Sequence, residues 1–187
     1  RMSHEIRTPM NGIIGMTEIA LKPEQSDERR VDCLNKVHAS SLYLLDLLNG
    51  ILDMTKIEND KMLLGDAPFS MSHVVEELNA VSAGRLAARN QKLVVDMRTQ
   101  HDWFMGDALR LSQVLINLVG NAVKYSDDGG TITVTIEERA ADAASAGDTR
   151  TANVYFAVAD EGVGIAEEDI ERIFAKFEQV NTTDARQ

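Results

Sequence analysis

The 187-residue chain is poor in cysteine and in positive charge, and it lacks long apolar runs. Its single cysteine, Cys33, cannot form an internal disulfide and has no partner at metal-ligand spacing, which indicates a reducing compartment. Nineteen Lys and Arg against 30 Asp and Glu give a formal net charge of −11, so nucleic acid is not an expected partner. No apolar run approaches the roughly 20 residues of a membrane span, and no signal peptide is recognisable. We therefore expect a cytoplasmic protein, with membrane attachment only through segments upstream of Arg1.

Apolar spacing predicts two long helices in the first third of the chain. In the first, apolar residues recur at intervals of four and three, as in a coiled-coil seam: Met2, Ile6, Pro9, Ile13, Met16 and Ala20. In the second, from about Glu28 to Glu58, a similar stripe contains Val31, Leu34, Val37, Ser41, Leu44, Leu48, Ile51 and Thr55, widened by Leu42, Leu45 and Leu52. An antiparallel hairpin of two such helices cannot bury both faces alone. We expect it to form a homodimer with a four-helix bundle.

Beyond the second helix, the pattern changes to alternating strands and helices. Turn residues predict a linker over residues 59–68, with a short strand at Met62–Leu64. The rest predicts a helix capped by Ser70 or Ser72 and ending near Ala88, a strand at Lys92–Met97, a helix from Asp107 to Lys124, strands at Thr131–Glu137 and Asn153–Ala159, and a solvated loop at Ala140–Arg150. We predict a helical hairpin over residues 1–58 and a layered α/β domain over residues 69–187, with helices on one face of the sheet.

The first helix has a polar face that suits phosphate transfer. At 100° per residue, Thr8, Asn11 and Gly15 lie within about 40° of His4 and opposite the apolar seam, so His4 should face solvent. A neutral imidazole can attack phosphorus with one nitrogen while a carboxylate shares the proton of the other, and Glu5 is adjacent. Taken alone, an exposed histidine on a polar helix face is more often without function.

A second group of polar residues occurs on the predicted Asp107–Lys124 helix. Asn117, Asn121 and Lys124 are spaced four and three apart, so one ligand could contact all of them. Amide oxygens suit Mg²⁺, which bridges nucleotide phosphates, and Lys124 adds a positive charge. Tyr125 follows where its ring could pack on a base. For the asparagine pair alone, two ordinary surface residues are the simpler interpretation.

The run Asp160–Gly164 follows the last predicted strand. There the Asp160 carboxylate could accept a hydrogen bond from an adenine amino group, and Gly162 and Gly164 permit close backbone approach to a ligand, or positive φ in a turn. Alone, this run is a weak signal, because many turns share it. It matches neither a dinucleotide-binding glycine motif nor a P-loop.

In this order, the runs Ser3–Pro9, Asn117–Lys124 and Asp160–Gly164 resemble the phosphoacceptor, asparagine and first glycine boxes of sensor and hybrid histidine kinases of two-component systems. The run Ile173–Gln179 resembles their phenylalanine box through Phe174 and Phe177, although both could be core aromatics of an amphipathic helix. The resemblance covers nearly the whole chain.

The resemblance implies a HisKA-type dimerisation and phosphoacceptor hairpin followed by a HATPase_c domain, an α/β sandwich of Bergerat (GHKL) type. A second glycine-rich box is expected after Gln179, and residues 180–187 contain none, so we expect a domain that is incomplete at its C-terminal end. ATP and Mg²⁺ are the implied cofactors. The implied nucleotide contacts are Asn117, Asn121, Lys124, Tyr125, Asp160, Gly162, Gly164, Phe174 and Phe177, with Asn117 and Asn121 toward the metal.

The resemblance also implies that the chain is a protein-histidine kinase. His4 would be phosphorylated, Glu5 would be its acid/base partner, and Thr8 would position water for removing phosphate from a partner. The phosphoryl group would pass to an aspartate of a response-regulator receiver domain, fused or separate. Two other functions stay open: a nucleotide-sensing or phosphatase-biased dimeric scaffold, and a conformational ATPase that forms no phosphohistidine.

Overall fold

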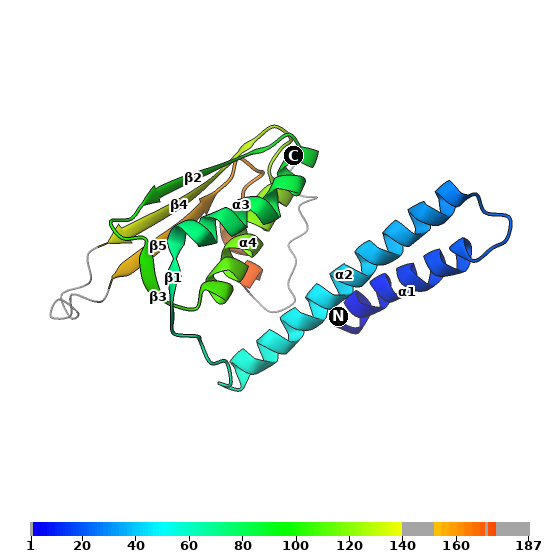
Figure 1. Cartoon of the computed structure of the whole chain (residues 1–187), viewed down its shortest axis with the longest axis horizontal. Helices are drawn as coiled ribbons and strands as arrows, with labels where there is room; N and C mark the ends of the chain where they lie inside the picture. Colours follow the sequence, from blue (N-terminus) through cyan, green and yellow to red (C-terminus); the bar gives the residue numbers. More distant parts are fainter. Residues whose placement is uncertain (1, 140–151, 171, 175–187) are drawn as a thin grey trace. The chain divides into compact units, whose positions relative to one another are not determined.

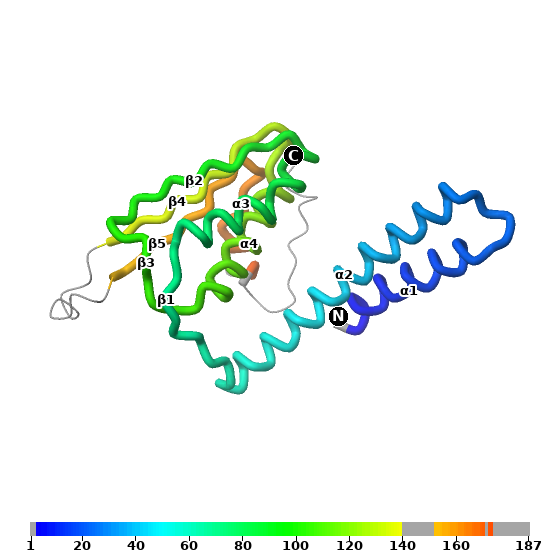
Figure 2. The backbone as a smooth tube through the Cα atoms, viewed as in Figure 1, coloured from blue at the N-terminus to red at the C-terminus, as the bar shows by residue number. Residues whose placement is uncertain are grey.

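The computed structural model describes residues 2–139, 152–170 and 172–174. The chain forms two compact units, and in sequence the unit with the first two helices gives way to the second between Leu63 and Leu64. Figures 1 and 2 trace both units along the chain by colour.

The first unit is an antiparallel helical hairpin, as predicted (Figure 1). Helix α1 spans Met2–Ala20, and helix α2 spans Asp27–Glu58. The hydroxyl of Ser26 accepts the Arg29 amide at 3.3 Å and so caps α2. Acidic residues occupy the first turn of α2 and Lys56 the last, which matches the helix dipole. Local signals therefore account for where α2 begins and ends.

The apolar residues of the hairpin divide into a packed set and an open set. Pro9 is buried in α1, and the seam residues after it are half-buried. In α2, Cys33 is fully buried and Val37, Leu44 and Ile51 are half-buried, whereas four leucines are more than half exposed: Leu34, Leu42, Leu45 and Leu52. Of these four, Leu34, Leu45 and Leu52 share one stripe of the helix. The apolar residues of α2, predicted to form a single stripe, thus form two. One stripe packs within the chain, and the other, the open leucine stripe of Leu34, Leu45 and Leu52, is exposed to solvent in a single chain.

Among its described residues, the second unit contains two sheets and two long helices. Its elements are β1 (Ala67–Ser70), α3 (Met71–Ala88), β2 (Lys92–Arg98), β3 (Trp103–Gly106), α4 (Ala108–Tyr125), β4 (Thr131–Arg139) and β5 (Asn153–Ala159), followed by the short 3₁₀ helix η1 (Glu167–Asp169). A further 3₁₀ turn, η2, spans Arg172–Phe174. Strand β1 pairs antiparallel with β3, and the larger sheet has the order β2-β4-β5, with β2 parallel and β5 antiparallel to β4.

Helices α3 and α4 cover one face of the three-stranded sheet (Figure 1). The buried core contains Met71, Val74, Leu78 and Leu86 of α3, Leu115, Val119, Ala122 and Val123 of α4, and Ile132, Val134 and Ile136 of β4. The three β4 residues alternate along the strand, as expected for a central strand with one face against helices. The predicted layered α/β architecture is confirmed.

Strand β1 corrects one prediction. The expected strand at Met62–Leu64 is absent: these residues are irregular, and Leu63 is 92% exposed. The first strand instead starts at Ala67 and contains Pro68, whose missing amide donor is tolerated in a two-stranded ribbon. Strand β3, its partner, was not predicted. The predicted loop at Ala140–Arg150 lies outside the described residues.

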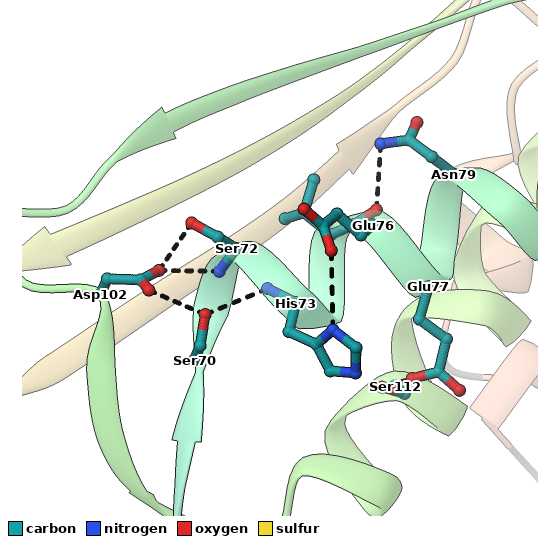
Figure 3. Close-up of polar contacts among 9 residues, drawn as sticks. Ser70, Ser72, His73, Glu76, Glu77, Asn79, Asp102 and Ser112 are labelled. Carbon is teal, nitrogen blue, oxygen red and sulfur yellow. Dashed lines mark hydrogen bonds and ion pairs between the residues drawn. The ribbon is translucent and has the colours of Figure 1, made fainter.

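A carboxylate fixes the start of α3 (Figure 3). Ser70, not Ser72, caps the helix, since its hydroxyl oxygen accepts the His73 amide at 3.2 Å. Asp102 accepts the Ser70 hydroxyl at 2.7 Å, and its other oxygen accepts the Ser72 hydroxyl at 2.7 Å and the Ser72 amide at 2.8 Å. These donors, the Ser72 hydroxyl first, hold the pKa of Asp102 below its usual range. The network ties the residue before β3 to the β1–α3 junction.

Candidate functional site

Helix α4 presents the predicted asparagine and lysine side chains from a firmly anchored scaffold. Its N-cap, Asp107, accepts the Gly65 amide at 2.9 Å and the Arg110 amide at 3.0 Å, and these donors lower the pKa of Asp107. The inner face of α4 is buried in the core. Asn117, Asn121 and Lys124 are exposed on the outer face. Within the described part of the chain, neither asparagine side chain has a hydrogen-bond partner, so their amide oxygens are available to a ligand.

Lys124 and Tyr125 contact each other at the end of α4. The Lys124 ammonium donates a hydrogen bond to the Tyr125 hydroxyl at 3.0 Å, and it lies 4.7 Å from the centre of the Tyr125 ring. This cation–π contact is at the surface, because the Tyr125 residue is 40% exposed. The ammonium of Lys124 has further donor hydrogens besides the one that contacts Tyr125.

The turn after β5 explains both predicted glycines. The Gly162 amide donates to the Asp160 carboxylate at 2.8 Å, which closes a tight turn. A Cβ atom on Gly162 would lie 2.6 Å from that carboxylate oxygen and 2.6 Å from the Tyr125 carbonyl oxygen, so only glycine fits. Gly164 has φ of +72°, in the left-handed region that favours glycine. Gly162 is thus required by the protein's own neighbouring atoms, while close approach to a ligand stays a prediction, and the predicted positive φ applies to Gly164.

A single β-bridge joins this turn to α4. Ser126, the C-cap of α4, pairs antiparallel with Gly162. The structure therefore brings Tyr125 and the Asp160–Gly164 turn together, although 35 positions separate Tyr125 from Asp160. Asp160 is exposed, and only one of its carboxylate oxygens is engaged within the described residues. The second oxygen is free to accept a bond from a ligand.

Three residues that support this junction were missed from the sequence. Glu161 accepts the Thr131 amide at 2.9 Å and so fastens the glycine turn to the start of β4. Arg89 and Gln91, between α3 and β2, contact carbonyls at the end of α4. Gln91 is only 7% exposed in the structure. Its polar side chain at the head of a predicted strand was the one signal in the sequence that could have indicated this role.

On α1, His4 is exposed as predicted, and Glu5 is half-buried. The Thr8 hydroxyl donates to the His4 carbonyl at 3.1 Å, which leaves the lone pairs of its oxygen to accept other bonds. Pro9 has no amide to offer the Glu5 carbonyl, its partner in a regular helix. No hydrogen bond joins Glu5 to the His4 ring in the described part of the chain, so the acid/base role of Glu5 stays a prediction.

The remaining predicted site residues are only partly visible. The backbone of Phe174 belongs to η2, whereas its side chain and all of Phe177 lie outside the described residues. Among the described residues, no group of three or more His, Cys, Asp and Glu could hold a metal ion. Of the helices that the structure describes, none has the length and apolar character needed to cross a membrane.

Comparisons with known families match both units. Residues 1–60 match the His Kinase A (phospho-acceptor) domain, and residues 106–187 match the histidine kinase-, DNA gyrase B- and HSP90-like ATPase. The signal transduction histidine-protein kinase BarA of Escherichia coli (strain K12) is 34% identical over 186 residues, which make up 99% of this chain and 19% of BarA. The chain spans about a fifth of the curated relatives it matches.

Solved structures agree with these matches. Full-length ShkA in complex with AMPPNP has a TM-score of 0.67 and 28% identity, over 95% of this chain and 36% of ShkA. The histidine kinase AdeS of Acinetobacter baumannii has a TM-score of 0.64 and 26% identity, over 89% of this chain and 76% of the AdeS chain.

Proposed function

Since the chain belongs to the sensor histidine kinases of two-component systems, we propose that it is the catalytic core of an ATP-dependent protein-histidine kinase. In this proposal, the second unit binds Mg·ATP, and His4 of the first accepts the γ-phosphoryl group and passes it to an aspartate of a receiver domain. The main support is the junction at which the Ser126–Gly162 bridge joins the end of α4 to the Asp160 turn.

The residues at this junction suit a purine nucleotide. The free Asp160 oxygen can accept a hydrogen bond from the adenine amino group, beside a Gly162 backbone without a side chain. Lys124 can exchange its contact with Tyr125 for a phosphate oxygen. The exposed amide oxygens of Asn117 and Asn121 have the hard-donor character that Mg²⁺ prefers. When bound, the metal would neutralise charge on the phosphates.

The exposure of His4 supports a role as the nucleophile. One imidazole nitrogen forms a bond to the γ-phosphorus while the bond from that phosphorus to the bridging oxygen breaks, and ADP leaves with the electron pair. Glu5 would take up the proton of the other ring nitrogen. In the second transfer, a receiver carboxylate oxygen attacks the same phosphorus and the nitrogen–phosphorus bond breaks. Thr8 would orient water when phosphate is removed from the receiver.

We also propose that the chain forms a homodimer and that it divides into a helical hairpin (1–58), a linker (59–68) and an ATP-binding domain (69–187). The open leucine stripe of α2 supports the dimer, because such a surface on one chain calls for a matching one. A receiver domain would dock on the polar His4 face, where Gly15 leaves space: no atom lies within 4 Å of an added Cβ.

Nucleotide binding tests this assignment through Asn121→Ala in the intact parent protein. We expect Mg·ADP to bind at least about tenfold more weakly by calorimetry, because an oxygen donor to the metal is lost. Asn79→Ala is the control, since Asn79 is also an exposed helical asparagine of this unit but lies on α3. Equal affinity of Asn121→Ala and wild type would sink the pocket assignment.

A further inference from the structure

The end of α4 has carbonyl groups that the helix itself cannot satisfy. The last four carbonyls of an α-helix lack intrahelical donors. In α4, the Ser126 amide bonds to the Ala122 carbonyl at 3.0 Å, so the carbonyls of Val123 and Lys124 need donors from elsewhere. Two side chains from the α3–β2 connection supply them, Arg89 and Gln91.

Arg89 bridges the last turn of α4 and the loop that follows. Its Nη1 donates to the carbonyls of Val123 and Lys124, the second at 3.0 Å, and its Nε donates to the Asp128 carboxylate at 2.8 Å. The Arg89 side chain is two-thirds covered, with 33% exposure. A guanidinium at this position also matches the negative end of the helix dipole.

Gln91 contacts the same turn from the interior. Its amide nitrogen lies 3.2 Å from the Val123 carbonyl, 3.4 Å from that of Ser126 and 3.1 Å from that of Asp127. Asn90, between the two clamping residues, has φ of 52°, a left-handed conformation that asparagine tolerates better than most residues. Arg89 and Gln91 thus both reach one helix end.

This helix end positions the residues of the proposed nucleotide site. It contains Lys124 and Tyr125, and Ser126 pairs with the glycine turn. The body of α4 is held by buried Leu115, Val119 and Ala122, so it does not need the clamp to stay folded. The clamp acts on the last turn, the part of a helix that frays most readily.

We infer that Arg89 and Gln91 are positioning residues that hold the last turn of α4 so that Lys124 meets the phosphate groups of a bound nucleotide. This inference rests on the proposed function, because it assumes that nucleotide binds at this helix. Arg89 and Gln91 act through backbone carbonyls and need not touch the ligand. Their loss should therefore weaken the binding of phosphate groups more than that of the nucleoside.

The test compares Mg·ADP with adenosine in the intact parent protein, by calorimetry and by NMR titration. Arg89→Ala should bind Mg·ADP about tenfold more weakly and adenosine within about twofold of wild type. Gln91→Met, which keeps the volume but removes the donor, should show the same split. The affinity of Arg89→Lys for Mg·ADP should lie between those of wild type and Arg89→Ala, since an ammonium cannot reach two carbonyls and the Asp128 carboxylate at once. The control is Arg85→Ala, which removes an arginine of α3 that lies near Gly120, in the middle of α4.

The outcomes separate the inference from the proposed function. A loss confined to Mg·ADP in Arg89→Ala and Gln91→Met, with Arg85→Ala near wild type, supports the clamp. Equal losses for ADP and adenosine, or no loss, overturn it while the nucleotide site stands. If wild-type protein binds neither ligand, the proposed function itself fails, and the clamp fails with it.

Discussion

At the scale of single residues, geometry explains why particular side chains occupy the proposed site. Gly162 is required by space, because a Cβ would collide with Asp160 and with the Tyr125 carbonyl, whereas Gly164 is favoured by its positive φ. From the sequence, either glycine was expected to allow close approach of a ligand or positive φ, and the crowding of Gly162 by Asp160 and Tyr125 was not predicted. His4 was placed on an exposed face by helix periodicity alone, and the structure agrees.

Asp102 is a residue whose pH dependence can be stated. The hydroxyl of Ser72, then that of Ser70, lowers its pKa in the folded protein. A lowered folded pKa adds stability above the unfolded pKa of about 3.9, and this contribution is lost as pH falls through the folded value. We expect Asp102→Asn to lower the melting temperature by several degrees at pH 7, with a gap to wild type that narrows below about pH 4. The unfolding of this unit can be followed by the fluorescence of Trp103, the only tryptophan in the sequence.

Asp66→Asn is the matched control for this measurement. Asp66 is exposed, and its carboxylate has no hydrogen-bond partner among the described residues, so its replacement should leave the melting temperature unchanged at every pH. A gap between Asp102→Asn and wild type that stays constant from pH 7 to pH 3 would contradict the account of Asp102.

At the scale of elements, the local signals were sufficient for helices and insufficient for one pair of strands. Cap residues predicted the starts of α3 and α4, since Ser70 and Asp107 act within four residues of their partners. The β1–β3 ribbon depends on pairing between residues more than 30 positions apart, and Pro68 concealed its first strand. The apolar run at Met62–Leu64 suggested a strand, but no described strand pairs with it.

The open stripe of α2 leads to a prediction about assembly. Leu34, Leu45 and Leu52 lie within about 20° of one another around the helix, and each is more than half exposed. Replacing Leu45 and Leu52 with aspartate would bring charge into a dimer interface, so the double variant Leu45→Asp, Leu52→Asp should be monomeric. Sedimentation equilibrium of the intact chain would measure this.

Ala39→Asp serves as the control, because Ala39 is exposed on α2 about 140° from Leu34. It should leave the dimer intact. Finding that the double variant sediments as a dimer like wild type would place the dimer interface elsewhere, and a monomeric wild type would remove the dimer altogether.

At the scale of the whole molecule, the order of the motifs along the chain indicated the family, although each motif alone was a weak signal. The asparagine pair and the Asp160 run were each ambiguous, and the Ser126–Gly162 bridge now joins the elements that contain them. The roles of Arg89 and Gln91 could not be predicted, because both residues act on carbonyls more than 30 positions away. The only signal was a polar residue, Gln91, at the head of a predicted strand. Sequence periodicity describes elements, whereas such contacts arise only when the elements pack.

Phosphorylation of His4 is the central claim, and one labelling experiment tests it most directly. The intact parent protein is incubated with Mg²⁺ and γ-labelled ATP, and acid-labile, base-stable label is measured in wild type, His4→Gln and His38→Gln. His38 is the control because it is an exposed histidine of the same hairpin. We expect label in wild type and His38→Gln and none in His4→Gln. Label in His4→Gln at the wild-type level, or release of free phosphate without any labelled histidine, would contradict the account.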